Sequence, residues 1–236
     1  MPTLLTSQCI ARHNLSSDCA NGMFCLFDEY FQNATYSKFQ RDLHNKDWVI
    51  LLRDQNDILQ GFSTFALYAT EFAGQMISVV CSGDTIVRPA YWGTPELPRS
   101  WIQNVLRLSG DMPRPLYWLL ISSGYKTYRF LSVFYREFYP RYDADTPSSV
   151  QELVNTIATH RFEADYCPLA GIVRFQSGNT PLRHGIAELT DERLQDAHVS
   201  YFVAKNPNHG EGDELVCLTR VDRDNFTAAG RRMIRT

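Results

Sequence analysis

The sequence predicts a mixed α+β protein whose central sheet is mostly antiparallel, includes one parallel strand pair and carries helices on both faces. Three β-type runs follow one another over residues 47–87 with only short polar links between them, and strands joined so closely pair antiparallel. A strand, helix, strand, helix order then covers residues 76–139. Such a unit places its two strands parallel to each other, with a right-handed crossover. We therefore expect a meander followed by one crossover unit in the same sheet.

Composition favours a packed domain and disfavours a nucleic-acid-binding protein. The chain has 236 residues, of which 44% are hydrophobic and 13% aromatic, enough for a sizeable core. Its formal net charge is -3, and it contains no long run of Lys or Arg. Without such a basic surface, DNA and RNA are poor candidates as partners.

The N-terminal segment carries no targeting or membrane signal. It has neither a basic stretch nor a following apolar stretch, and no window of the chain approaches the roughly 18 apolar residues that a spanning helix needs. We therefore expect a cytoplasmic protein without a membrane span. Residues 1–22 are polar and weakly periodic, which predicts an N-terminal arm or an irregular first strand ahead of a single domain at residues 23–236.

Cysteine and histidine spacing predicts no metal cofactor. The six cysteines form no CxxC pair, and the six histidines form no HxH or HxxxH pair. The usual spacings of zinc ligands are therefore missing. Scattered cysteines in apolar runs are more often buried or surface thiols than members of a disulfide framework.

Residues 23–45 are expected to form two consecutive amphipathic helices. Aromatic residues recur there at helical spacing, beginning with Phe24, and the pattern resumes at Phe39 after a polar break. An aromatic stripe of this kind usually packs into the core. The alternative is that the stripe forms the wall of a substrate pocket.

Residues 47–53, 58–70 and 76–87 are expected to be the three strands of the meander. The first two flank a polar turn and form a hairpin, because β-branched and aromatic residues dominate both runs. Gly61 within the second run predicts a bulge or the close approach of another backbone.

The junction at residues 76–107 is the main candidate for ligand binding. An apolar strand passes through a turn rich in Gly, Pro and aromatic residues into a helix. That helix begins near residues 94–98, where a polar cap and an early Pro favour helix initiation. Its first N–H groups offer a common place for a phosphate or carboxylate. The apolar run 116–122 then predicts a buried strand, and the aromatic segment 125–139 predicts a helix that ends before Pro140.

The C-terminal part of the chain is expected to extend the main domain. Residues 143–149 are typical of a linker and residues 150–161 of a helix. Short strands are predicted at residues 171–175, 201–204 and 214–221, separated by turns rich in Gly, Pro and Asn, and a charged helix is predicted at 188–196. We expect an extension or insertion around residues 143–213.

This order of elements resembles the GNAT superfamily of acyl-CoA-dependent N-acyltransferases over about residues 23–221. In that family two helices precede a β-meander, a splayed strand leads into the phosphate-binding helix, and a strand, a helix and a final hairpin follow. The family motif begins with Val-x-Pro, which Val87, Arg88 and Pro89 match, and Gly93 matches its first glycine. The resemblance therefore implies that the parallel pair separates near Asp84.

Two positions of this motif depart from the family pattern. Ala90 stands where the family has Arg or Gln, and Pro95 stands at the second glycine. Pro95 also removes one backbone N–H donor from the pyrophosphate-binding turn. Arg88, Arg99 or Lys126 can supply the missing positive charge.

The resemblance implies acyl transfer from a thioester, either acyl-CoA or an acyl carrier protein, to the amine of a small molecule. Backbone N–H groups at residues 86–88 are expected to align the pantetheine arm and to polarise the thioester carbonyl. The residues expected to bind the thioester are Ile86, Val87, Arg88, Trp92, Gly93, Thr94 and Arg99.

Three residues are candidates for proton transfer. Asp84 is the carboxylate best placed to take the proton of the amine, directly or through water. The resemblance implies that Tyr135, or in competition with it Tyr128, protonates the leaving thiolate. Each has a structural alternative: residues 82–85 are also typical of a turn or β-bulge, and both tyrosines lie in a stretch where rings usually pack.

A second hypothesis is a GNAT-shaped protein without catalysis that binds a ligand or another protein. Ala90 and Pro95 favour this hypothesis, whereas Asp84 and Tyr135 favour the enzyme. The sequence is compatible with a homodimer in either case. A screen of thioester donors separates the two hypotheses.

Overall fold

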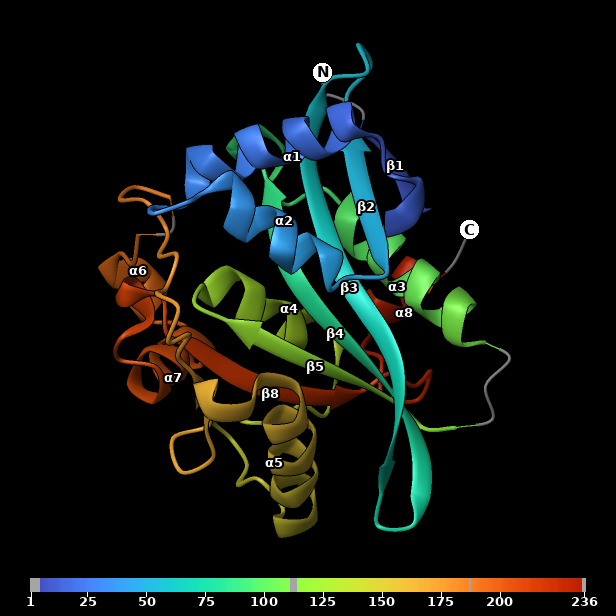
Figure 1. Cartoon of the computed structure of the whole chain (residues 1–236). Coiled ribbons are helices and arrows are strands. Elements are labelled where there is room, and N and C mark those ends of the chain that lie inside the picture. The colour runs from blue at the N-terminus through green and yellow to red at the C-terminus, as the bar shows by residue number, and fades with distance from the viewer. Residues whose placement is uncertain (1–4, 111–113, 187, 235–236) are drawn as a thin grey trace.

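The computed structural model describes residues 5–110, 114–186 and 188–234. Within these residues one eight-stranded sheet forms the centre of the molecule, in the order β1-β2-β3-β4-β5-β8-β7-β6 (Figure 1). The strands are β1 (Thr6–Ala11), β2 (Trp48–Arg53), β3 (Leu59–Phe72), β4 (Gln75–Val87), β5 (Leu116–Ser122), β6 (Tyr166–Cys167), β7 (Ile172–Val173) and β8 (Glu214–Arg220). All neighbouring pairs are antiparallel except β4 with β5. The expected mixed α+β sheet with one parallel pair is confirmed.

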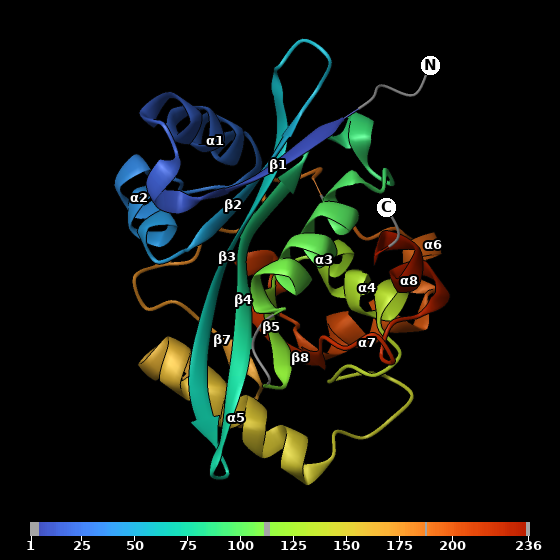
Figure 2. The same cartoon turned by 90° about the vertical axis from the view of Figure 1, so that its right-hand side faces the viewer.

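Helices cover both faces of this sheet. They are α1 (Ser17–Tyr30), α2 (Tyr36–His44), α3 (Glu96–Ser109), α4 (Tyr125–Phe134), α5 (Ser148–Phe162), α6 (Asp191–Leu194), α7 (Ala197–Lys205) and α8 (Ala228–Ile234). One face, which we call the α1 face, packs against α1, α2 and α5. The opposite α3 face packs against α3, α4, α7 and α8 (Figure 2). The two consecutive helices expected at residues 23–45 are therefore present as α1 and α2.

Alternating side chains of the central strands reach both faces. In β2, Val49 and Leu51 contact the α1 face cluster, while Ile50 and Leu52 belong to the cluster on the α3 face. All four are at most 1% exposed, because successive residues of a strand point to opposite sides. This explains why residues 47–53 form a continuous apolar run rather than an alternating one.

The parallel pair β4–β5 is bonded over only part of its length. Its register runs from Ser78 with Leu116 to Cys81 with Leu119. Beyond this point β4 continues to Val87 along β3, and β5 continues to Ser122 along β8. The two strands therefore diverge, as Figure 1 shows at their carboxyl ends. The separation that the resemblance implied near Asp84 is confirmed.

Gly61 allows the backbone of β4 to approach β3 closely. A Cβ at this position would lie 2.6 Å from the carbonyl oxygen of Ile86, and only glycine avoids that contact. The pairing of β2 with β3 is irregular beside it, between Leu52 and Arg53. The close approach expected at Gly61 is confirmed.

Of the two alternatives expected for residues 1–22, an N-terminal arm or an irregular first strand, the structure has a strand. β1 pairs with β2 from Thr6 with Arg53 to Ala11 with Trp48, and α1 already begins at Ser17. β1 lies at the edge of the sheet with its first three residues exposed. It therefore lacks the apolar alternation that marks a half-buried strand in a sequence. Residues 1–4 lie outside the described part of the chain.

The helix expected over residues 125–139 ends about one turn early. α4 stops at Phe134, and Tyr135 is already extended, with φ -121° and ψ 144°. Further along, Tyr139 and Leu218 exchange two backbone hydrogen bonds of 2.8 and 2.7 Å. Strand-like pairing thus replaces the last turn, helped by Pro140, which disfavours helical geometry in the residue before it.

The short strand expected at residues 201–204 is wrong, because this segment belongs to α7. The Asp196 carboxylate accepts hydrogen bonds from the N–H groups of His198 and Val199 and so caps the helix. Val199 and Phe202, three residues apart, are both fully buried. A four-residue apolar run is too short to distinguish a strand from a buried helix by its period.

We expect the last bonded position of the β4–β5 pair to be important for stability. Replacing the fully buried Leu119 by alanine (Leu119→Ala) leaves a cavity between β5 and α5, and should lower the free energy of unfolding by about 2–5 kcal/mol. Urea denaturation measures this loss. The matched control is Leu169→Ala, whose side chain is 100% exposed and whose loss should change stability by less than about 0.5 kcal/mol. Equal effects of the two substitutions would contradict this packing.

Candidate active site

A β-bulge places Asp84 at the point where β4 leaves β5. Ser63 of β3 is opposite Thr85, and Phe65 is opposite Ser82, so Thr64 alone faces two residues of β4. The extra residue shifts the alternation of side chains at Gly83 and Asp84. The bulge considered for residues 82–85 is present, and it lies beside charged groups rather than at an isolated turn.

A buried lysine lies beside this bulge. Lys46, between α2 and β2, is only 7% exposed, and its Nζ lies 2.7 Å from Oδ1 of Asp42 in α2. Asp84 in turn is close enough to Asp42 and Lys46 to interact with both electrostatically. Three charged side chains on the α1 face therefore meet at the bulge.

A third carboxyl group, that of Glu214, belongs to the same cluster from the far side of the separation. Glu214 is the first residue of β8, and its neighbour Leu215 pairs with Ser122 at the end of β5. Val216 and Leu218 of β8 pack on the α1 face, so Glu214 points to that face as well. Asp84 on the β4 side and Glu214 on the β5 side thus flank the separation.

The surroundings of both carboxylates favour their protonated forms. Burial and the nearby Asp42 raise the pKa of Asp84 to about 7, although the Lys46 ammonium opposes this rise. Burial and the negative charge of Asp84 raise the pKa of Glu214 to about 8. A carboxylate with a pKa near neutrality can both take and release a proton under physiological conditions.

The two tyrosine candidates lie on the opposite face of the sheet from Asp84. Tyr135 is 1% exposed and packs against Trp118 and Phe226, with ring centroids 5.8 and 5.1 Å away. Within the described residues its hydroxyl has no hydrogen-bond partner, and burial raises its pKa well above the usual range. The Tyr128 hydroxyl instead donates a 3.0 Å hydrogen bond to the carbonyl of Pro140.

In the turn after β4, the Trp92 side chain donates a hydrogen bond to a backbone carbonyl at the end of the strand. The N–H of Arg88 donates to Gln60 of β3, so the carbonyl of Val87 in the same planar peptide unit points away from β3. The indole Nε1 of Trp92 donates to this carbonyl at 2.7 Å. Lys126, at the start of α4, places its Nζ 3.1 Å from the centroid of the Trp92 ring.

The remaining predicted thioester-binding residues surround this turn. Ile86 is buried against the α1 face cluster, and Arg88 forms a 2.7 Å ion pair with Glu29. The Thr94 hydroxyl donates to the carbonyl of Tyr91. Gly93 has a φ of 86°, which glycine adopts readily.

The start of α3 offers limited anion-binding capacity. Pro95 is its N-cap and makes no side-chain cap, while Glu96 places a carboxylate in the first turn, where it interacts favourably with the helix dipole. Arg99 is exposed. Of the three basic residues considered for the missing charge, Arg88 and Lys126 have the specific neighbours Glu29 and Trp92.

A strap at residues 181–186 joins the two sides of the separation. The N–H of Gln32 donates to the carbonyl of Pro181, and the N–H of Arg183 donates to Tyr30 at the end of α1, both at 2.8 Å. The Leu182 side chain lies next to Gly124, which follows β5. Because α1 packs on β3 and β4, the strap connects the β4 side to the β5 side.

Neither a metal cluster nor a membrane-spanning helix is found in the described part of the chain. No three His, Cys, Asp or Glu side chains are grouped there as metal ligands would be. None of the helices within residues 5–110, 114–186 and 188–234 is both long and apolar enough to cross a bilayer.

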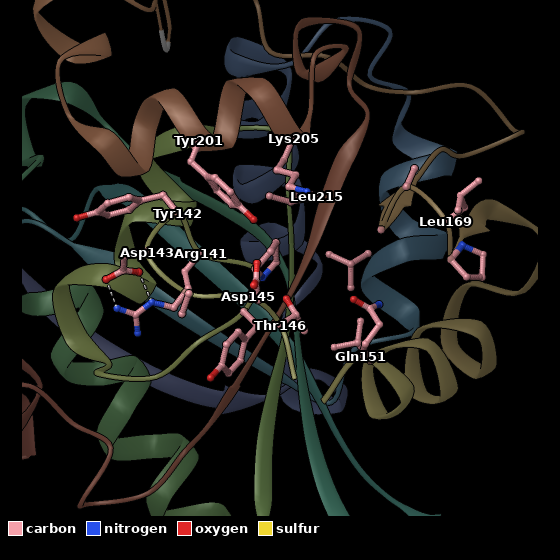
Figure 3. A pocket seen from close by; sticks show the side chains of 18 residues that line it. Arg141, Tyr142, Asp143, Asp145, Thr146, Gln151, Leu169, Tyr201, Lys205 and Leu215 are labelled. Atoms are coloured by element: carbon pink, nitrogen blue, oxygen red, sulfur yellow. Dashed lines mark hydrogen bonds and ion pairs between the residues drawn. The ribbon is translucent and has the colours of Figure 1, made fainter. Parts of the chain in front are cut away.

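A cavity of about 510 Å³ lies elsewhere, at the edge of β8 between the loop 139–146, α5 and α7 (Figure 3). On its wall Arg141 is paired with Asp143 and also donates to the carbonyl of Arg136. None of the predicted site residues lines this cavity. Because the Arg141 guanidinium is already paired with Asp143, we propose no ligand for this cavity.

Sequence reasoning missed Asp42, Lys46 and Glu214. Asp42 and Lys46 are four residues apart across the end of a helix, a spacing that is usually a solvated surface pair. Glu214 was placed correctly at the start of a strand, but nothing local indicates that it faces Asp84. Only the pairing of distant strands brings these residues together.

No protein-family model matches the chain, and no curated protein matches it in sequence. Among solved structures, a GNAT family N-acetyltransferase from Escherichia coli in complex with CoA is 15% identical, with a TM-score of 0.37 over 55% of this chain and 67% of its own. A probable N-acyltransferase from Enterococcus faecalis is 12% identical, with a TM-score of 0.40 over 92% of this chain and 66% of its own.

An acetyltransferase from Trypanosoma brucei is 15% identical, with a TM-score of 0.40 over 60% of this chain and 99% of its own. The match spans about two thirds of the length of the first two structures. All three TM-scores are below 0.5. The strand order and the separation of β4 from β5 stand on the geometry described above.

The raised pKa of Asp84 predicts a specific dependence of stability on pH. Its pKa of about 7 in the folded chain exceeds the value of about 3.9 in an unfolded chain, so the folded state retains a proton that the unfolded state has lost. The stabilisation is complete below about pH 4 and is lost as the pH rises to about 7. Asp84→Asn removes this loss. The free energy of unfolding of the variant, compared with that of the wild type, should therefore rise by up to about 1.4 kcal/mol per pH unit over that window.

Urea denaturation at several pH values measures this difference. The exposed Asp145 provides the matched control Asp145→Asn, which removes a carboxylate outside the cluster and should not reproduce the effect of Asp84→Asn. A constant difference for Asp84→Asn would contradict the proposed environment of the carboxylate.

Proposed function

We propose that the protein is an N-acyltransferase that moves an acyl group from acyl-CoA to the amine of a small molecule. The observation that carries this proposal is the position of Asp84 and Glu214, which flank the separation of β4 and β5 with pKa values of about 7 and 8. Separated strands leave backbone groups available to a thioester, and both carboxylates lie beside the separation on the α1 face. An acyl carrier protein is the second donor to test.

In this reaction Asp84 takes a proton from the substrate ammonium, directly or through water. The free amine attacks the thioester carbonyl and forms the new C–N bond, while backbone N–H groups of the separated β4 end stabilise the oxyanion. The C–S bond then breaks, and the leaving thiolate takes up a proton. Glu214, whose pKa of about 8 keeps it mostly protonated at neutral pH, lies on the other side of the separation as a second group that can exchange a proton.

Tyr135 is our proposed proton donor to the thiolate. Within the described residues its hydroxyl makes no competing hydrogen bond, and this is the observation that supports the role. Burial raises its pKa and so makes it a weaker acid. Because Tyr135 packs on the α3 face, the role requires that the thiolate leave toward that face, opposite Asp84. Tyr128 is less suited to this role, because its hydroxyl proton is donated to Pro140.

A non-catalytic binding protein is the second candidate, and Trp92 is the observation that favours it. Its indole takes the Val87 carbonyl that a pantetheine amide would otherwise meet, and Lys126 lies over its ring. A chain in which this arrangement is permanent would keep the fold without admitting a thioester. The two candidates therefore differ in whether Trp92 can be displaced.

We expect Asp84→Asn to remove most of the transferase activity. The amide cannot accept the ammonium proton, so kcat/KM at pH 7 should fall roughly 10²–10⁴-fold. The wild-type rate should rise with pH through about 7, as Asp84 becomes ionised. Release of free thiol from acetyl-CoA and longer acyl-CoA donors, in the presence of a set of small amines, measures this rate.

Asp145→Asn is the control and should keep wild-type activity. Carrier-bound donors extend the screen if no acyl-CoA reacts. If no thioester releases thiol with any amine, the transferase proposal is wrong and the binding protein is favoured.

Trp92→Ala tests whether the turn limits entry of the donor. Removing the indole frees the Val87 carbonyl and the Lys126 ammonium, so acetyl-CoA should raise the melting temperature more in the variant than in the wild type. Tyr142→Ala removes a similarly exposed ring, 50% exposed compared with 44% for Trp92, and should leave the shift unchanged. If neither wild type nor Trp92→Ala shifts with any thioester, the non-catalytic candidate is supported.

A further inference from the structure

Gly83 is surrounded by atoms that leave no room for a side chain. A Cβ at this position would contact Cε of Lys46, and would lie 2.6 Å from Oγ1 of Thr64 and 2.9 Å from Nζ of Lys46. Real Cβ atoms are essentially never closer than 3.0 Å to such neighbours. The space that any other residue would fill is therefore taken by the lysine.

Backbone conformation does not explain this glycine. Six glycines of the described chain have a positive φ, including Gly93 and Gly212, but Gly83 is not one of them. Its backbone is therefore in a region that other residues adopt readily. What requires glycine at this position is the room it leaves for Lys46.

The path of Lys46 is unusual for a lysine. Its side chain is almost completely buried, whereas lysines are rarely buried unless their charge is paired. The Asp42 carboxylate pairs with it at 2.7 Å, and Asp84 is close enough to interact with it electrostatically. By crossing the empty position at Gly83, the ammonium pairs with Asp42 and comes within electrostatic range of Asp84.

We propose that Gly83 and Lys46 form a positioning pair for Asp84, in which the missing side chain admits the lysine and the lysine orients the carboxylate and favours its ionised form. Lys46 acts through Asp84 and is a positioning residue. The pair rests on the proposed function only in assigning Asp84 the role of base. Its effect on the Asp84 carboxyl group can be measured without any substrate.

Other charged and titratable groups around the cluster set the background for this effect. They are Asp42 and Lys38 from α2, Cys81 from β4, Arg161 from α5 and Glu214 from β8. Burial lowers the pKa of Lys46, but Asp42 and Asp84 outweigh burial, so the net shift is upward. Lys46 therefore stays charged at neutral pH and opposes the upward shift of Asp84 that burial and Asp42 cause.

The test is a ¹³C NMR titration of the Asp84 carboxyl group in protein labelled at aspartate. The resonance is assigned by its absence in Asp84→Asn. Lys46→Met keeps a long side chain but removes the charge, so the midpoint of Asp84 should rise by about one pH unit or more. Gly83→Ala displaces the ammonium and should move the midpoint in the same direction.

Gly210→Ala is the matched control, because a Cβ there meets nothing within 4 Å. It should change neither the titration nor the melting temperature. If Gly83→Ala alone does not fold, Gly83→Ala combined with Lys46→Ala restores room, and the double variant should fold and melt close to Lys46→Ala.

An unchanged Asp84 midpoint in Lys46→Met would overturn the proposal, since a purely structural lysine would leave the titration where it is. A Gly83→Ala variant with wild-type midpoint and melting temperature would overturn the spatial argument. Both readouts need no acyl donor. Absence of acyl transfer therefore counts against the proposed function, while an unmoved titration counts against the positioning pair.

Discussion

Hydrogen bonding between β4 and β5 ends at Cys81 and Leu119, although both strands continue beyond this point. The rest of the structure depends on this interruption. Each strand keeps its outer partner, β3 for β4 and β8 for β5, so the separation leaves the rest of the sheet intact. Backbone groups at an interrupted pair must find other partners or water. Here Trp92 supplies one such partner to the Val87 carbonyl.

The charged cluster also divides the core on the α1 face. Apolar residues under α1 and α2 form one cluster, and those under α5 form another. Asp42, Lys46, Asp84 and Glu214 come from elements that border these clusters. Burying charge is unfavourable unless it is paired, so a cluster with raised carboxyl pKa values is retained at a cost in stability. Functional sites commonly show this pattern.

Features with a local cause could be predicted from the sequence. The apolar run 116–122 became β5 with the same limits, because one short buried run leaves few alternatives. Tyr135 was predicted within a helix, yet pairing of the following segment with β8 ends α4 earlier. The place of Lys46 in the charged cluster could not be predicted, because its side chain fills the space left by the missing side chain of Gly83 in a distant strand. The sequence also placed Asp84 at the bulge without indicating that Glu214 would face it.

In the proposed acyl transfer, the α1 face beside the separation would receive the amine, and the turn after β4 would bind the thioester. We call these the acceptor side and the donor side. On the acceptor side the carboxylates are assembled, with pKa values suited to proton transfer near neutral pH. On the donor side Trp92 and Lys126 occupy the turn, and Glu96 lies at the start of α3. A single 2.7 Å hydrogen bond and one cation–π contact hold the indole, interactions of about 1–2 kcal/mol each. A thioester arm that makes equivalent hydrogen bonds to β4 can compensate for their loss, so an assembled acceptor side and an occupied donor side are compatible in one enzyme.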